Sequence, residues 1–350
     1  MTSLVIEARG LRRDFVVSRR VGRLRRERST VAAVAGLDLA VETGELLGYL
    51  GPNGAGKSTT LKMLTGVLRP SAGDLRVCGL VPVVQRRALA RQIGVVFGQR
   101  SQLWWDLPLR DSFELARHIW RVPLADHAAR LARFTRDLEL SFLDTPVRQL
   151  SLGQRMRAEL TVALLHGPRV LFLDEPTIGL DVVSKQAVRS FLVELRDRGD
   201  TTVVLTTHDL SDIERLCRRL VVIDHGRVVH DGTLESLHVR YGSRRTVVVT
   251  LDEPLVHAVL LPGVDLTESS VDGRVLTFSL DGSRTAAGAL VATLAQTGAL
   301  RDISIAEPAI EDVIARLYAS PAPAQPPAPA SGAAGATGAE VWSGQEQPIS

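Results

Sequence analysis

The sequence has few of the features that would place a protein in a membrane, on a secretory route or among disulfide-bonded proteins. No apolar run approaches the roughly 18 residues of a membrane-spanning helix. The opening residues, MTSLVIEARGLRRDF, do not have the layout of a signal peptide. Only two cysteines are present, Cys78 and Cys217, and their spacing fits no metal site, so both are expected to be small core residues. We therefore expect a cytoplasmic protein that reaches a membrane only through a partner.

Lysine is also scarce, with three lysines among 42 basic residues, and the net charge is only +3. Arginines are interleaved with acidic residues almost everywhere, so the composition does not indicate a nucleic-acid-binding surface. The exception is SRRVGRLRRERST, residues 18–30, with six arginines against one glutamate. This segment is either a solvated hairpin tip or a patch for anionic headgroups or a partner.

At 350 residues the chain is long enough for two domains, and its N-terminal part has the pattern of a parallel α/β protein. Short runs of Val, Leu and Ile alternate with helical stretches up to about residue 238, as is typical of strands buried on both faces. Residues 110–145 are helical throughout, which predicts a helical subdomain at about 100–165 within a domain spanning 1–238. The expected strands are LLGYLG (46–51), IGVVFG (93–98), VLFLDE (170–175), TTVVLTT (201–207) and LVVIDH (220–225).

A small α+β domain is expected at 240–318. The order of strand and helix patterns indicates a βαββαβ-like module. Residues 319–350 are rich in Pro, Ala, Gly and Ser, which predicts a disordered tail. The strand and helix patterns of the module lie at 245–251, 274–280, 285–296, 300–306 and 310–318.

The strongest motif is GPNGAGKST, residues 51–59, which matches Gly-x-x-x-x-Gly-Lys-Ser/Thr between an expected strand and an expected helix. Gly54 and Gly56 let the backbone curl so that successive N–H groups converge on phosphate oxygens. Lys57 is expected to neutralise the β- and γ-phosphates, and the Ser58 hydroxyl to ligate Mg²⁺. The other nucleotide-contacting residues expected in this loop are Asn53, Ala55 and Thr59.

A second motif, VLFLDEP (170–176), is an apolar strand that ends in two carboxylates. Asp174 is expected to hold the Mg²⁺ shell through water, and Glu175 to polarise the attacking water. Pro176 is expected to keep Glu175 extended, because a residue before proline avoids the helical region. After a phosphate loop in the same α/β unit, this pair indicates nucleotide hydrolysis.

A third stretch, QLSLGQRMRAEL (149–160), predicts a helix that begins after Ser151. Gly153 and Gln154 fall in its first turn, where a packed helix has no need of them. Helix N-termini with small residues and free amides bind anions. The sequence therefore predicts a second anion site, about a hundred residues after the first.

With these three motifs in this order, the sequence resembles the nucleotide-binding subunits of ATP-binding-cassette (ABC) transporters over about residues 4–238. LSLGQ resembles the family's signature, with Leu152 where the family has glycine. The resemblance implies a P-loop NTPase-type cassette, with a mixed sheet core and a helical subdomain. It also implies that Ser151, Gly153 and Gln154 cap ATP held by a second, head-to-tail subunit, which gives the second anion site its ligand.

Four further residues take their roles from this resemblance. Gln99 matches the glutamine that links Mg²⁺ to the transmembrane partner, and His208 matches the histidine that contacts the γ-phosphate. Asp181 matches the loop that crosses the dimer interface. Phe15 matches the aromatic residue that stacks on adenine, although the arginine-rich insertion separates it from the phosphate loop. The implied catalytic residues are Glu175, His208 and Gln99, and the implied Mg²⁺ site consists of Ser58, Gln99 and Asp174.

Within the family, GQRSQLWWDLP, SLGQRMRAEL and LFLDEPTIGLDVVSK most resemble the ATPase subunits of type 2 exporters of drugs and amphiphiles. The resemblance implies an ATPase that binds ATP and Mg²⁺ on the cytoplasmic face of the membrane. It would work as a homodimer or heterodimer that powers export through separate permease chains. Trp104 and Trp105 are then either an apolar socket for a permease helix or ordinary core residues.

Two other functions remain open at this stage. A soluble ABC ATPase acting on nucleic acid or ribosomes usually has tandem cassettes or a long coiled-coil insertion, and the sequence has neither. A nucleotide sensor that does not hydrolyse would have little use for Glu175, Gln99 and His208 together. We therefore expect the transport function, without nucleic acid as a partner.

Overall fold

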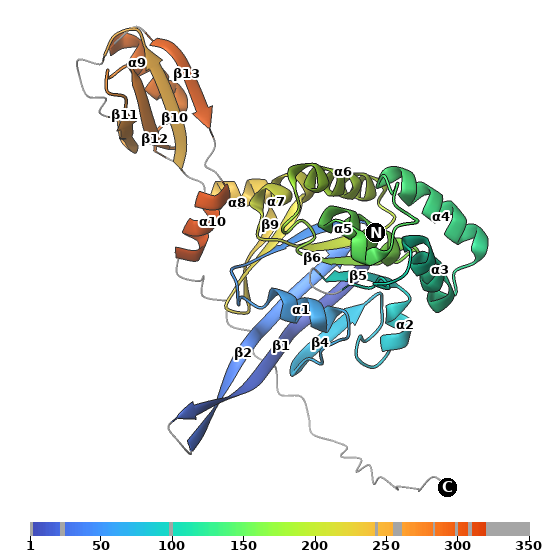
Figure 1. Ribbon diagram of the computed structural model, residues 1–350. Coiled ribbons are helices and arrows are strands. Elements are labelled where there is room, and N and C mark those ends of the chain that lie inside the picture. The colour runs from blue at the N-terminus through green and yellow to red at the C-terminus, as the bar shows by residue number, and fades with distance from the viewer. Residues whose placement is uncertain are drawn as a thin grey trace, which may run out of the picture. The chain divides into compact units, whose positions relative to one another are not determined.

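The computed structural model describes residues 3–21, 25–97, 101–241, 244–254, 261–282, 284–297, 300–306 and 310–319 (Figure 1). The chain divides into a compact unit, Met1–Ser320, and a second unit, Pro321–Ser350, which lies outside the described residues. The predicted disordered tail therefore falls almost entirely where nothing is described. Within the described ranges, none of the helices combines the length and apolar character needed to cross a bilayer.

The compact unit contains a six-stranded sheet in the order β5-β6-β7-β3-β8-β9. All its neighbours are parallel except β8 and β9, so the predicted mixed sheet is confirmed. Along β6, Val170 and Phe172 enter one core cluster while Leu171 and Leu173 enter the other, because successive strand residues point to opposite faces. The strands are β3 (Leu46–Leu50), β5 (Ile93–Phe97), β6 (Val170–Asp174), β7 (Thr202–Thr206), β8 (Arg219–Asp224) and β9 (Arg227–Thr233).

Helices cover this sheet. The helical stretch predicted at 110–145 is α3 (Leu109–Trp120) and α4 (Leu124–Asp137), which lie at the right-hand edge of Figure 1. The side chains of Phe113 and Phe134 are fully buried in the core that these helices share with the sheet. The remaining helices of this part are α1 (Lys57–Leu64), α2 (Arg86–Ala90), the short 3-10 helix η1 (Val147–Gln149), α5 (Leu152–Leu164), α6 (Val182–Arg198), α7 (Leu210–Leu216) and α8 (Leu234–Tyr241).

A second, antiparallel sheet packs beside α1 in the order β2-β1-β4. Its strands β1 (Leu4–Val21) and β2 (Arg25–Glu42) form a long hairpin whose register runs from Leu4↔Glu42 to Val21↔Arg25. The third strand, β4 (Ala72–Val77), pairs with β1 only over Ile6–Arg12. The described residues of the arginine-rich segment, 18–21 and 25–30, therefore form the distal, two-stranded part of a hairpin (Figure 1).

The C-terminal part contains an antiparallel sheet in the order β11-β12-β10-β13, with its own apolar core that includes Phe278 and Leu290. The first helix of the expected βαββαβ order would fall between β10 and β11, where 255–260 lie outside the described residues. The last helix, α10, packs with α8, and its Ile310, Val313 and Leu317 belong to the core of the large sheet. The elements are β10 (Arg244–Leu251), β11 (Val264–Ser269), β12 (Val275–Asp281), α9 (Ala287–Thr297), β13 (Leu300–Ala306) and α10 (Ile310–Ala319).

Candidate functional site

The loop between β3 and α1 has the backbone that a phosphate cradle requires. Gly54 and Gly56 have φ of 85° and 107°, which only glycine adopts readily. At Gly56 a side chain is excluded for a second reason, because a Cβ atom would lie 2.4 Å from the carbonyl oxygen of Ala33 on β2. The side chain of Lys57 folds into this loop, where its Nζ donates to the carbonyl oxygens of Gly51 (2.5 Å) and Pro52 (3.2 Å).

Lys57 is 7% exposed, and burial lowers the pKa of its ammonium while Glu175 and Asp174 act in the opposite direction. The two carboxylates are thus close enough to Lys57 to influence its charge. They lie at the end of β6. In the sheet, only β7 stands between β6 and β3, the strand that leads into the phosphate loop. The parallel strands bring the first two sequence motifs to one edge of the sheet, as expected for carboxyl ends of neighbouring strands.

Asp174 faces the phosphate loop. One carboxylate oxygen lies 3.4 Å from the hydroxyl of Ser58. The other accepts a hydrogen bond of 2.6 Å from the buried Thr206 hydroxyl, which fixes the carboxylate's direction. Sequence reasoning missed Thr206, although its place in LTTHD just before His208 gave a signal. Thr206 stands directly beside Asp174 in the parallel register of β6 and β7, which only the fold reveals.

Glu175 and His208 form a contact pair, with Oε1 of Glu175 3.2 Å from Nδ1 of His208. The expectation that Pro176 keeps Glu175 extended is wrong: Glu175 has φ of 54°, in the left-handed region. Its N–H still bonds to the carbonyl oxygen of Thr206 (2.9 Å), so the chain leaves the sheet by turning at Glu175 itself. Non-glycine residues with this φ are uncommon and concentrate at functional sites.

The oxygen ligands that Mg²⁺ prefers are present at this edge. Ser58 and Asp174 offer a hydroxyl and a carboxylate that face each other, and such sites usually complete the shell with water and nucleotide phosphates. In the described ranges no cluster of three or more His, Cys, Asp or Glu side chains could hold a metal by itself. The donor set therefore fits Mg²⁺ carried by a nucleotide. Gln99, the third predicted ligand, lies outside the described residues.

The first turn of α5 has structural uses that the sequence did not reveal. Ser151 caps the helix in a reciprocal capping box. Its hydroxyl accepts from the N–H of Gln154 (3.2 Å), and Oε1 of Gln154 accepts from the N–H of Ser151 (2.9 Å). Gly153 is buried against α6, and a Cβ atom there would lie 2.0 Å from Oγ of Ser184. The expectation that a packed helix has no need of Gly153 and Gln154 is therefore wrong. Leu152 is 40% exposed, and its Cδ2 lies 3.3 Å from the place a Cβ atom on Gly179 would occupy.

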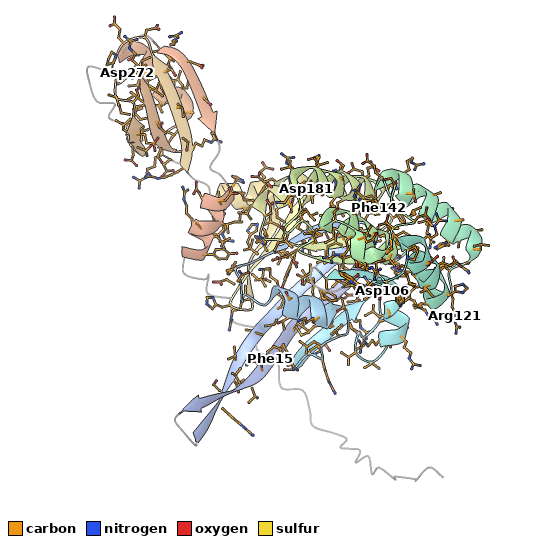
Figure 2. The ribbon with its side chains drawn as sticks, viewed as in Figure 1. Phe15, Asp106, Arg121, Phe142, Asp181 and Asp272 are labelled. Atoms are coloured by element: carbon orange, nitrogen blue, oxygen red, sulfur yellow. The ribbon has the colours of Figure 1, made fainter. Side chains whose placement is uncertain are left out.

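Asp181 begins α6 and lies exposed at its N-terminus (Figure 2). Its carboxylate accepts from the N–H of Ser184 (2.9 Å) and from the Ser184 hydroxyl (2.7 Å). These hydrogen bonds lower the pKa of Asp181. Ser184 thus bonds to Asp181 and packs against Gly153. It links two of the predicted interface residues within one chain.

Phe15 lies on β1 opposite Val31 of β2, and its side chain is 36% exposed (Figure 2). The hairpin accounts for the long stretch of sequence between Phe15 and the phosphate loop. After the insertion, β2 returns the chain so that Ala33 contacts Gly56. One face of the Phe15 ring is covered by the guanidinium of Arg13, at 4.7 Å from the ring centroid.

Trp104 and Trp105 are 37% and 51% exposed, so the alternative that both are ordinary core residues is wrong. Their loop is held to α5. The guanidinium of Arg155 lies 5.8 Å from the ring of Trp105. Glu159, which is 5% exposed, accepts from the Ser101 hydroxyl and from the N–H of Gln102 (3.1 Å). Glu159 gave no signal in the sequence, because a single carboxylate in an apolar helix pattern has no partner at fixed spacing.

The sequence model described as ABC transporter matches residues 34–178. The chain is 35% identical over 294 residues to the daunorubicin resistance ATP-binding protein DrrA3 of Streptomyces coeruleorubidus, covering 81% of this chain and 90% of that protein. It is 44% identical over 210 residues to the Nod factor export ATP-binding protein I of Burkholderia pseudomallei (strain 1710b), covering 58% of this chain and 67% of that protein.

A longer relative and a solved structure extend the comparison. ABC transporter A family member 1 of Dictyostelium discoideum is 32% identical over 239 residues, which are 68% of this chain and 27% of that protein. A solved structure, described as an ATP-binding subunit of an ABC transporter, matches with a TM-score of 0.58 and 26% identity. That match covers 68% of this chain and 93% of the solved one.

Proposed function

Since this chain belongs to the ABC transporter family, as one of its ATP-hydrolysing subunits, we propose that two copies enclose ATP between them and drive export through separate permease chains. The observation that carries the proposal is the convergence of Lys57, Asp174, Glu175 and His208 at the carboxyl ends of β3, β6 and β7. These side chains can hydrolyse a nucleoside triphosphate as well as bind it.

The signature segment supports a site shared between two copies. Within the described ranges, no hydrogen bond joins residues 150–154 to residues 51–59 of the same chain. The N–H groups of Leu152 and Gly153 lie in the first turn of α5, where a helix offers no internal acceptor. An anion brought by a second copy would satisfy these donors and the positive end of the helix dipole. Closure would then be driven by charge-assisted hydrogen bonds across the seam, each about 1.5–3 kcal/mol.

The chemistry assigned to each residue follows from its position. The loop amides and Lys57 bind the β- and γ-phosphates, and Glu175 orients a water in line with the γ-phosphorus. We propose that His208, which contacts Glu175, contacts the γ-phosphate of the bound nucleotide. Ser58, Asp174 through water, and Gln99 would hold Mg²⁺, which neutralises charge on the phosphates.

Phe15 is the proposed platform for the base. Arg13 covers one face of this ring, and we assign the opposite face to adenine. Stacking on a phenyl ring distinguishes purines only weakly. Preference for adenine over guanine therefore has to come from groups other than Phe15.

The direction of transport and the permease are proposed from two further observations. The relatives include proteins named for daunorubicin resistance and for Nod factor export, which agrees with the resemblance to type 2 exporters. Trp104 and Trp105 present exposed indoles on the loop after Gln99, which suits contact with an apolar permease segment. We place the subunit at the cytoplasmic face of the membrane, as part of a homodimer or heterodimer.

The test is the variant Glu175→Gln, which keeps the shape of the side chain and removes its charge. It should bind ATP, accumulate as an ATP-bound dimer in light scattering, and release phosphate at least about a hundredfold more slowly than wild type. Glu194→Gln changes an exposed α6 carboxylate whose only ion pair among the described residues is with Arg198 (3.4 Å), and it should behave as wild type. Wild-type hydrolysis by Glu175→Gln would show that another group directs the water.

A further inference from the structure

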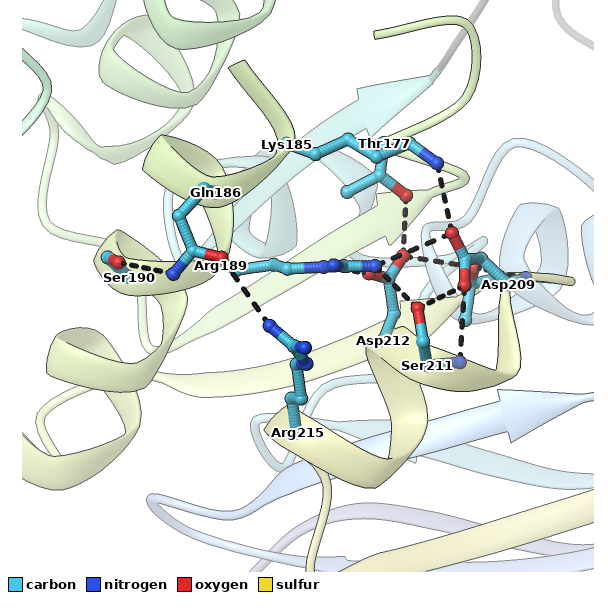
Figure 3. A network of polar contacts seen from close by, with 10 residues as sticks. Thr177, Lys185, Gln186, Arg189, Ser190, Asp209, Ser211, Asp212 and Arg215 are labelled. Carbon is cyan, nitrogen blue, oxygen red and sulfur yellow. Dashed lines mark hydrogen bonds and ion pairs between the residues drawn. The ribbon is translucent and has the colours of Figure 1, made fainter. Parts of the chain in front are cut away.

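A buried ion pair joins Arg189 of α6 to Asp212 of α7 (Figure 3). Asp212 of α7 is 0% exposed, and its carboxylate accepts from Nε of Arg189 on α6 at 2.5 Å. It also accepts from the hydroxyl of Thr177 at 2.5 Å and lies 3.4 Å from that of Thr207. The carboxylate is thus satisfied from three separate segments of the chain.

These partners adjoin the two catalytic residues in sequence. Thr177 follows Glu175 by two residues, with Pro176 between them, and Thr207 immediately precedes His208. Asp212 therefore bonds to the chain just beyond Glu175 and just before His208. A shift of this carboxylate would move both segments.

The residue after His208 is held by the same helix. Asp209 forms ion pairs with Lys185 (3.0 Å) and Arg189 (3.4 Å), and it caps α7 through the N–H of Ser211 (3.1 Å). Burial raises the pKa of Asp209, but the bonds from Ser211 and Lys185 outweigh it and bring the pKa to about 2. This carboxylate is therefore charged at neutral pH.

One face of α6 carries the cationic partners of Asp209 and Asp212. Asp181, Lys185 and Arg189 recur every four residues, and residues at this spacing share a helix face. Ser184 bonds to Asp181 and packs against Gly153 of the signature. The helix thus links the signature, which the proposed second copy would contact, to the segments next to Glu175 and His208.

Stability alone does not account for a charge pair at this place. Removing two charges from water is costly, and apolar residues of similar volume often serve a buried site as well or better. An ion pair with fixed hydrogen-bond directions instead specifies one geometry. We propose that Arg189 and Asp212 are positioning residues that fix Glu175 and His208 relative to each other. This inference rests on the proposed function, in which those two residues act on the nucleotide.

The experiment uses the full chain and compares Asp212→Asn, Thr177→Val and Arg196→Gln. Thr177→Val removes one hydroxyl that donates to Asp212 and keeps the ion pair, so it is the mildest change. Arg196 is the matched control, because it also joins α6 to α7, through the carbonyl oxygen of Leu216 (3.0 Å), but at the end away from His208. The readouts are the melting temperature, kcat, and KM for ATP.

Asp212→Asn should lower kcat about tenfold or more and Thr177→Val about threefold, with KM changed less than about twofold, because misplacement of reacting groups affects the chemical step. Arg196→Gln should keep kcat within about twofold of wild type even if it melts earlier. Equal loss of kcat in Thr177→Val and Arg196→Gln, or no loss in Thr177→Val, overturns the proposal. If Asp212→Asn does not fold, Thr177→Val against Arg196→Gln decides alone.

Glu175→Gln and His208→Ala, measured in the same assay, distinguish failure of the proposed function from failure of the positioning role. If both retain wild-type turnover, the proposed function fails. If both are inactive while Thr177→Val turns over ATP like wild type, only the positioning role of Arg189 and Asp212 fails.

Discussion

Gly153 and Ser184 approach so closely that a Cβ atom on Gly153 would lie 2.0 Å from the Ser184 hydroxyl oxygen and 2.6 Å from its Cβ. The contact joins the first turn of α5 to the first turn of α6. A glycine in this signature position is thus required by packing inside one chain, whatever it does at the seam between copies.

The substitution Gly153→Ala should therefore destabilise the free subunit, by about 1–3 kcal/mol, as overpacking of a closed contact does. The measurement is urea unfolding of Gly153→Ala, of Ser184→Gly and of the double variant. In the Ser184→Gly background the obstructing atoms are gone, so the alanine should cost clearly less. An equal cost of Gly153→Ala in both backgrounds would contradict the packing explanation.

Thr206→Val should weaken hydrolysis more than stability. The substitution keeps the volume of a buried side chain and removes the hydroxyl that holds Asp174 at 2.6 Å. We expect kcat to fall about tenfold and the concentration of Mg²⁺ needed for half-maximal activity to rise.

The matched control for Thr206→Val is Thr202→Val on the same strand. Thr202 is equally buried, and its hydroxyl accepts from the N–H of Gly44 (2.9 Å), away from Asp174. It should lose stability without a change in the Mg²⁺ requirement. An equal rise in the Mg²⁺ concentration that Thr202→Val needs for half-maximal activity would show that the effect is not specific to Thr206.

His166 should make stability depend on pH. Burial lowers the pKa of its imidazole to about 4, although the hydrogen bond to the carbonyl of Ile93 acts in the opposite direction. Between about pH 6.5 and 4 the unfolded chain binds a proton that the folded chain does not, so stability falls as pH falls, by at most about 1.4 kcal/mol per pH unit. Denaturant unfolding from pH 7 to 4.5 should show this loss in wild type and a shallower loss in His166→Gln. Equal slopes would mean that His166 titrates alike in both states.

The strands and the phosphate loop could be predicted because their signals are local. The apolar runs at 46–51 and 170–175 are continuous, and the loop glycines stand at fixed spacing. The pairing of strand ends also follows once the sheet is assumed parallel, because the carboxyl ends of parallel strands meet at one edge of the sheet.

The rest depends on contacts between segments that the sequence does not align. Thr206 acts on Asp174 only through the register of two strands, and Glu159 reaches Ser101 across 58 positions. The left-handed turn at Glu175 arises because the chain must leave the sheet while its N–H still bonds to β7. Proline restricts the preceding residue but does not choose among the regions it leaves open.

The central claim, a nucleotide site with walls from two copies, is tested most directly by mixing two inactive variants of the full chain. Lys57→Ala lacks a working phosphate loop and keeps its signature, while Ser151→Arg lacks the signature and keeps its loop. Each should be inactive alone. Mixed at equal amounts, they form dimers with one intact shared site, and phosphate release should return to about a quarter of the wild-type rate. If the mixture stays as inactive as its components, hydrolysis does not take place between two copies.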